Sequence, residues 1–209
     1  QTECAAGTYQ ASTGQSSCNV ADAGYYVDTN ASTTQTECAA GTYQASTGQS
    51  SCTDASAGYY VPTTGQSSQT ECAAGTYQPD TGQTSCIDAD AGYYVDTNAS
   101  TTQTECPEGT YQSLTGQTSC SYVEAGYYLD TNISANQIPC ALGTYQPGTG
   151  QSSCIDADPG YYVDTNASTT QTECALGTYQ SATGQSSCVD ADPGYYVDTN
   201  ASTTQTECA

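Results

Sequence analysis

The chain has 209 residues, of which 22 are acidic and none is lysine, arginine or histidine, so its formal net charge is −22. Phosphate backbones and anionic lipid surfaces are bound through lysine and arginine, so this composition excludes ordinary nucleic-acid binding and electrostatic attachment to membranes. Leucine, isoleucine, valine and phenylalanine together number only 16, too few for an ordinary hydrophobic core. We therefore expect the thirteen cysteines to stabilise the fold, as disulfides do in other core-poor units.

The predicted elements recur along the chain with a strict period. Twelve glycines follow a 17-residue period, and the cysteine spacings alternate between 14 and 20, which gives a full 34-residue repeat. Such an array predicts a small disulfide-rich all-β fold: an elongated tandem-repeat rod of short β-hairpins, with two 17-residue halves in each 34-residue unit. The predicted repeats are 4–37, 38–71, 72–105, 106–139, 140–173 and 174–207, between the end of a preceding repeat (1–3) and the start of a following one (208–209), as in a cropped array.

Each repeat is expected to contain two hairpins. The first reads CAAGTYQASTGQSSC in residues 4–18, where GTYQ favours a strand and Thr-Gly marks a turn. The second reads GYYVDTNASTTQTEC in residues 24–38, with β-prone segments on either side of an asparagine-centred tip. No stretch shows helical periodicity, so the two halves look like versions of one β motif.

The cysteines can pair in two ways, at the 14-residue or at the 20-residue spacing, and spacing alone does not decide between them. The 14-residue set is favoured because each of its pairs flanks the arms of one short hairpin. This set is Cys4–Cys18, Cys38–Cys52, Cys72–Cys86, Cys106–Cys120, Cys140–Cys154 and Cys174–Cys188, with Cys208 pairing outside residues 1–209. A metal–thiolate array would need clustered CxxC pairs or histidines, which the chain lacks. Regular disulfides indicate an oxidising compartment, so we expect an extracellular or cell-surface protein.

The first half of every repeat resembles the ephrin-receptor-like cysteine-rich repeat, which belongs with the growth-factor-like and tumour-necrosis-factor-receptor-like modules. The resemblance rests on segments such as CPEGTYQSLTGQTSC at 106–120, which follow the pattern Cys-Pro-x-Gly-Thr-Tyr, Thr-Gly, Ser-Cys. It implies an extracellular disulfide-linked β module used in adhesion, receptor ectodomains or surface coats, and it supports the 14-residue pairing. In the second halves, Ala21 and its equivalents replace a family cysteine, so these hairpins would lack a disulfide of their own. The replaced positions are Ala21, Ala55, Ala89, Val123, Ala157 and Ala191.

Asparagine-linked glycosylation is predicted at the tip of the second hairpin. Five of the seven asparagines stand in Asn-x-Ser at this tip, one per repeat, and Thr64 takes the position in the second repeat. The alternative is an Asx turn that happens to precede a serine. The predicted sites are Asn30, Asn98, Asn132, Asn166 and Asn200.

Tyrosines are the candidates for the core. A tyrosine stands two residues after each of the twelve glycines, and stacking of the repeats would align these rings in a ladder of aromatic contacts. The tyrosines are Tyr9, Tyr26, Tyr43, Tyr60, Tyr77, Tyr94, Tyr111, Tyr128, Tyr145, Tyr162, Tyr179 and Tyr196.

Closely spaced aspartates are weak candidates for calcium ligands, because hard cations bind oxygen. They lie just before the second hairpin in three repeats, and a solvated acidic face is the alternative. The pairs are Asp88 and Asp90, Asp156 and Asp158, and Asp190 and Asp192. We expect no cofactor beyond covalent glycans, with calcium as a weak candidate.

An enzyme is not expected, because the chain has no histidine or lysine and its carboxylates recur without a unique cleft. The pattern favours a structural extracellular glycoprotein that forms the repetitive shaft of a filament, flagellar hair or surface coat. The alternative is the stalk or ectodomain of a cell-surface adhesion or receptor protein that binds carbohydrate or protein. The expected partners are other copies of the chain, in a filament or bundle, or neighbouring surface glycoproteins, without nucleic-acid binding or direct membrane insertion.

Overall fold

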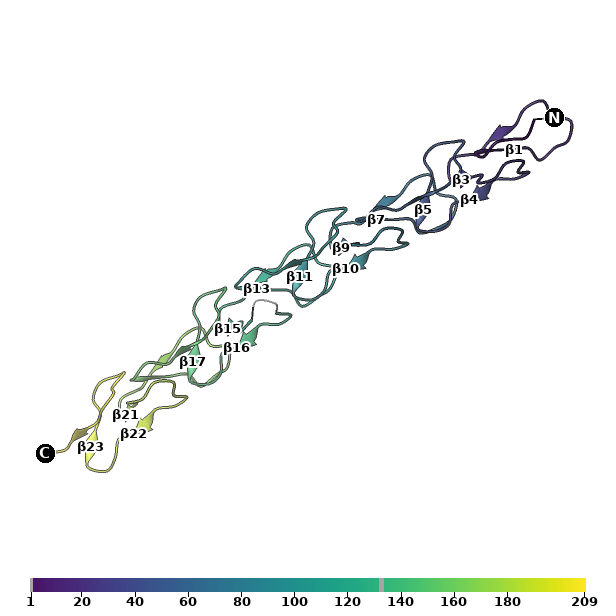
Figure 1. The fold of residues 1–209 in the computed structure, drawn as a ribbon. Helices are drawn as coiled ribbons and strands as arrows, with labels where there is room; N and C mark the ends of the chain where they lie inside the picture. The colour runs from purple at the N-terminus through teal and green to yellow at the C-terminus, as the bar shows by residue number, and fades with distance from the viewer. Residues whose placement is uncertain (1, 132–133) are drawn as a thin grey trace. The chain divides into compact units, whose positions relative to one another are not determined.

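The computed structural model describes residues 2–131 and 134–209, and within them the regular elements are two-residue β-strands without a helix. Each odd-numbered strand pairs with the strand that follows it (Figure 1). The register is antiparallel, as in the pairing of Thr8 with Val20. The strand pairs are β1 (Thr8–Tyr9) with β2 (Asn19–Val20), β3 (Tyr25–Tyr26) with β4 (Thr36–Glu37), β5 (Thr42–Tyr43) with β6 (Thr53–Asp54), β7 (Tyr59–Tyr60) with β8 (Thr70–Glu71), β9 (Thr76–Tyr77) with β10 (Ile87–Asp88), β11 (Tyr93–Tyr94) with β12 (Thr104–Glu105), β13 (Thr110–Tyr111) with β14 (Ser121–Tyr122), β15 (Tyr127–Tyr128) with β16 (Ile138–Pro139), β17 (Thr144–Tyr145) with β18 (Ile155–Asp156), β19 (Tyr161–Tyr162) with β20 (Thr172–Glu173), β21 (Thr178–Tyr179) with β22 (Val189–Asp190), and β23 (Tyr195–Tyr196) with β24 (Thr206–Glu207).

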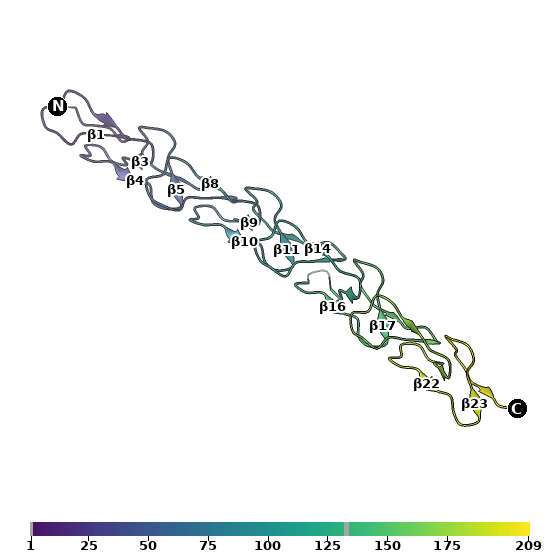
Figure 2. The same cartoon turned by 180° about the vertical axis from the view of Figure 1, so that it is seen from behind.

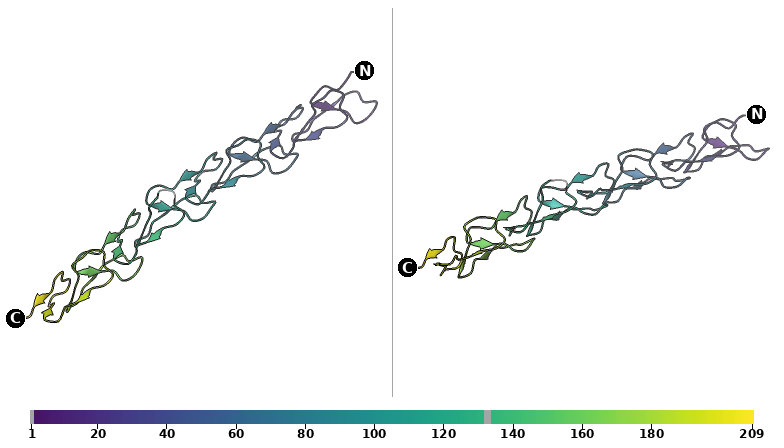
Figure 3. Two further views of the ribbon diagram at one scale, coloured as in Figure 1. Left: turned by 60° about the horizontal axis from the view of Figure 1, so that its bottom comes forward. Right: turned by 90° about the horizontal axis from the view of Figure 1, so that it is seen from below.

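The chain forms two compact units. The first comprises Gln1–Asp90, Tyr94–Thr104 and Thr115–Ser119, and the second comprises Ala91–Tyr93, Glu105–Leu114 and Cys120–Ala209. In the first unit the hairpins from β1 to β10 follow one another in chain order (Figures 1 and 2). The second unit shows the same succession from β13 to β24, which the labels of Figure 1 and the shared colours of Figure 3 identify. The predicted all-β tandem repeat of disulfide-linked hairpins is thereby confirmed.

Backbone hydrogen bonds join each hairpin to the next. The amide of Gly7 donates to the carbonyl of Val27 at 2.8 Å, and the amide of Ala31 donates back to the carbonyl of Cys4 at 2.7 Å. Equivalent bonds recur at 17-residue steps inside each unit. Buried backbone groups need such partners, and strands of two residues supply few of them. The contacts between neighbouring hairpins therefore hold these short strands in place.

The 17-residue glycine period has a steric cause. A Cβ atom at Gly143 would lie 2.7 Å from the carbonyl carbon of Gly184, two hairpins further along, and closer still to its oxygen. The φ angle of Gly143 is +83°, in the left-handed region that disfavours every residue with a side chain. Close approach of a hairpin tip and left-handed backbone thus both require glycine at this position.

The buried side chains of the core lie three residues before or three residues after a repeated glycine. In the disulfide-linked hairpins these positions hold cysteine and glutamine, and in the other hairpins they hold alanine or valine and then valine or leucine. The buried apolar side chains are Ala21, Val27, Cys38, Ala55, Val61, Cys72, Ala89, Val95, Cys106, Val123, Leu129, Cys140, Ala157, Val163, Cys174 and Val197.

The repeated tyrosines, which the sequence predicted to pack in the core, are not among its fully buried side chains. Eleven of the twelve are half-buried, and the last, Tyr196, is 45% exposed. They lie in two-residue strands that each have a single partner strand. The smaller side chains at the two flanking positions fill the interior instead. The predicted ladder of aromatic contacts stays a prediction.

Candidate functional site

Six disulfides join cysteines at a sequence separation of 14, and the alternative 20-residue pairing does not occur among them. Each closes one hairpin with Cα atoms 5.7–5.8 Å apart, a normal separation for a disulfide. Cys208 is a free and exposed thiol in residues 1–209. The bonds are Cys4–Cys18, Cys38–Cys52, Cys72–Cys86, Cys106–Cys120, Cys140–Cys154 and Cys174–Cys188.

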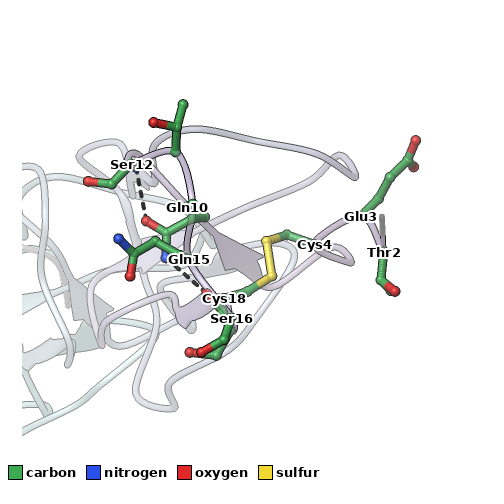
Figure 4. A pocket seen from close by; sticks show the side chains of 11 residues that line it. Thr2, Glu3, Cys4, Gln10, Ser12, Gln15, Ser16 and Cys18 are labelled. Carbon is green, nitrogen blue, oxygen red and sulfur yellow. Dashed lines mark hydrogen bonds between the residues drawn. A yellow bond between two sulfur atoms is a disulfide. The ribbon is translucent and has the colours of Figure 1, made fainter.

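A glutamine organises the loop that each disulfide closes. In the first hairpin, Gln10 Nε2 donates to the carbonyl of Ser17 at 2.9 Å, and Gln10 Oε1 accepts from the amide of Ser12 at 3.0 Å (Figure 4). Gln78 makes the same two bonds in the third disulfide-linked hairpin while only 4% exposed. A buried amide is tolerated there because both of its ends have partners.

The hairpins without a disulfide are closed by a second glutamine, which we call the glutamine latch. Gln35 follows Ala21 in the chain at the same interval that separates Cys18 from Cys4. Its Oε1 accepts from the amide of Asp22 at 2.8 Å, and its Nε2 donates to the Asp22 carboxylate at 2.7 Å. The sequence interpretation missed this closure, although glutamine recurs at the missing cysteine position in every repeat. The latch residues are Gln35, Gln69, Gln103, Gln137, Gln171 and Gln205.

The four described sequon asparagines, at positions 30, 98, 166 and 200, are exposed at hairpin tips, and Asn132 lies outside the described residues. Asn30 Oδ1 accepts from the amide of Ala6 at 3.0 Å, and Asn98 makes the equivalent bond with Ala74. The alanine after each described sequon asparagine has φ between 53° and 56°. At Asn30 and Asn98 the exposed Asn-x-Ser segment is thus bonded to the preceding hairpin, and glycosylation stays a prediction.

The aspartate pairs proposed as calcium ligands serve separate contacts. Asp90 accepts from latch residue Gln103 at 2.8 Å, whereas Asp88 lies beside the tip glycine Gly116. Asp158 and Asp192 also accept from their latch glutamines. Within residues 2–131 and 134–209, no three or more acidic, cysteine or histidine side chains are grouped to hold a metal ion.

A shallow groove recurs where a latch-closed hairpin meets the next disulfide-linked hairpin. In the first unit it has a volume of about 330 Å³, and in the second unit about 420 Å³. The first groove is lined by Tyr26, Glu37, Ala39, Thr42, Ser51 and Cys52. The second is lined by the equivalent Tyr162, Glu173, Ala175, Thr178, Ser187 and Cys188, together with Asp164 and Ser186. Sequence reasoning did not identify this groove, because its residues come from two hairpins.

The carboxylate of the first groove belongs to Glu37 and accepts two side-chain hydrogen bonds. Glu37 accepts from the hydroxyl of Tyr25 at 3.2 Å and from the hydroxyl of Thr64 at 2.8 Å. The charge of Glu37, followed by this hydrogen bond, raises the pKa of Tyr25. Thr64 stands at the sequon position of its repeat, and its hydroxyl reaches the groove glutamate of the preceding repeat.

No protein-family model and no curated protein matches this chain. Among the described residues, no helix has the length and apolar character to cross a membrane. The six disulfides indicate folding in an oxidising environment. The chain is accordingly described as a tandem repeat of disulfide-linked and latch-closed β-hairpins.

Proposed function

We propose that this chain is the repetitive part of an extracellular structural glycoprotein, working as the shaft of a filament, a flagellar hair or a surface coat. The observation that carries this proposal is the uniformity of the contacts. The amide of Gly24 donates to the carbonyl of Gln44 at 2.8 Å, and the equivalent amide of Gly160 donates to the carbonyl of Gln180 at 2.7 Å. Contacts that recur in this way extend a structure by repetition, which suits a protein that supplies length and surface.

The surface suits an extracellular shaft. Its net charge of −22 favours solubility and repulsion between unscreened shafts, so lateral association would depend on salt or cations. Glycans on the exposed sequon asparagines would cover the hairpin tips at intervals of one repeat. Partners in this proposal are further copies of the chain or neighbouring surface glycoproteins. The ephrin-receptor-like resemblance of the first halves fits the same extracellular setting.

Electron microscopy of the native material tests the proposal. Uniform fibres whose surface repeats with the period of the 34-residue unit would support the filament shaft. Isolated particles with a distinct head on a thin stalk would instead support the receptor or adhesion alternative. Glycopeptide mass spectrometry tests the glycoprotein part separately, because it reports whether Asn30, Asn98, Asn166 and Asn200 carry sugar.

A further inference from the structure

The sequon tip of one repeat is hydrogen-bonded to the chain segment that lines the groove at the junction with the preceding repeat. In the second unit, the amide of Ala201 donates to the carbonyl of Cys174 at 2.9 Å. Cys174 stands between Glu173 and Ala175, both of which line the groove. Asn200 precedes Ala201 and is exposed, so a saccharide attached to it starts within reach of the groove.

The carboxylate of this groove is available. In the first unit, Thr64 replaces the sequon asparagine, and its hydroxyl donates a hydrogen bond to the Glu37 carboxylate at 2.8 Å. In the described part of the chain, by contrast, no side chain donates to the carboxylate of Glu173, which precedes Cys174 in the chain. In the repeat that lacks a sequon, a protein hydroxyl thus donates to the groove carboxylate. In the second unit, the Glu173 carboxylate can still accept hydrogen bonds from a ligand.

The chemistry of the groove fits a sugar. An ionised carboxylate only accepts hydrogen bonds, and the hydroxyl and acetamido groups of an N-linked saccharide supply donors. The hydroxyls of Thr178 and Ser187 can donate as well as accept, and Tyr162 provides a half-buried aromatic ring for the apolar face of a sugar. An apolar surface with a few convergent polar groups is the usual composition of a small-ligand site.

We propose that the first sugar on Asn200 docks in the groove lined by Tyr162 and Glu173, so that this N-linked glycan is bound at the junction with the preceding repeat. This inference rests on the glycosylation included in the proposed function. The glycan then connects two successive repeats and becomes part of the fold, in addition to coating its surface.

The chain contains a matched natural control. Asn166 lies at the equivalent tip, and its neighbour Ala167 donates to the carbonyl of Cys140 at 2.8 Å. The groove position of Glu173 is there taken by Pro139, which has no carboxylate and still pairs in its strand with Tyr127. The saccharide on Asn166 therefore has the same attachment geometry without the principal acceptor.

The experiment compares two secreted proteins, each with one intact sequon. Both carry Ser32→Ala, Ser100→Ala and Ser134→Ala. One adds Ser168→Ala and keeps Asn200, and the other adds Ser202→Ala and keeps Asn166. A peptide amidase that cleaves the sugar–asparagine bond is applied to the native proteins, and glycopeptide mass spectrometry measures the rate of release.

Docking is expected to slow release from Asn200 about fivefold relative to Asn166, if the sugar is bound for about four-fifths of the time. Glu173→Pro should remove this protection, and Pro139→Glu should create it at Asn166. Glu173→Ala gives a second test that does not alter the backbone. After reduction and denaturation, both proteins should lose sugar at the same rate.

Two results would overturn the inference, and they differ in what they say about the proposed function. If the native proteins release sugar from Asn200 and Asn166 at equal rates, and Glu173→Ala does not change the rate at Asn200, docking is excluded. The proposal that the protein is a glycoprotein would then still stand. An Asn200 without sugar in the secreted protein would remove both the glycan coat at this site and the docked sugar.

Discussion

Substituting Gly143 by alanine should destabilise the second unit much more than the same change at Gly177. Both glycines lie in the identical segment ALGTYQ and have a φ angle of +83°. A Cβ at Gly143 would collide with the carbonyl group of Gly184, whereas a Cβ at Gly177 would meet no atom of the described residues within 4 Å. The pair therefore separates the cost of left-handed backbone from the cost of the tip contact.

The expected magnitudes follow from these two terms. Left-handed backbone costs a residue with a Cβ about 1–2 kcal/mol, and the lower entropy of the unfolded alanine variant offsets about 0.4–1 kcal/mol of this. We expect a net loss of roughly 1 kcal/mol for Gly177→Ala. Gly143→Ala adds the cost of overpacking, about 1–3 kcal/mol. The difference corresponds to roughly 5–150-fold in an opening equilibrium constant.

Native-state hydrogen exchange measures this difference. The amide of Gly184 donates to the carbonyl of Ala157 at 2.8 Å, so its exchange rate reports opening of the tip contact. Exchange at Gly184 should accelerate far more in Gly143→Ala than in Gly177→Ala. Equal acceleration in the two variants would show that the tip contact does not require glycine, and the steric account of the 17-residue period would be wrong.

Three further predictions concern the latch, one tyrosine and the charge. Gln171→Ala removes the hydrogen bonds to the amide and the carboxylate of Asp158 and should lower the free energy of unfolding, measured in urea, by about 1–2 kcal/mol. An unchanged urea midpoint would show that the latch does not stabilise the fold. Glu37 raises the pKa of Tyr25 above 10.0, so this pair contributes to stability below that pH, and the contribution is lost as pH rises through the folded-state pKa. In Glu37→Gln, ultraviolet titration should show the pKa of Tyr25 returning toward its ordinary value. An unchanged titration would contradict the assignment. Because all 22 charged side chains are acidic, raising NaCl from low to physiological concentration should increase the melting temperature, and a decrease would contradict net repulsion in the folded state.

Much of the fold could be predicted from local sequence patterns. Thr-Gly and Asn-Ala tips, β-prone segments such as GTYQ and the strict cysteine spacing describe hairpins that form from residues close in the chain. The core could not be inferred in the same way. Tyrosine is the largest apolar residue in the repeat, but its position in a two-residue strand leaves it half-buried, and Val27 with Ala21 fills the interior.

The latch and the groove depend on side-chain contacts, and only the latch has a signal in the sequence, the glutamine that recurs at the missing cysteine position. Taken alone, Gln35 resembles any polar residue in a serine- and threonine-rich segment until the hairpin brings it to Asp22. Tyr162 and Thr178 belong to different hairpins and line one groove only after those hairpins have packed. The family resemblance covered the disulfide-linked halves and offered no closure for the others.

Local patterns in the chain are enough to predict the 17- and 34-residue periods, the hairpins and the sequon positions, because turn chemistry and cysteine spacing act over short distances. Tertiary structure decided why the period is strict. The tip of each hairpin bonds to the preceding hairpin and covers the glycine of the one before it, as Gly48 does with Ala21 and Gly7. An insertion in any hairpin would displace contacts across three successive hairpins, and this physical coupling keeps the repeat in register.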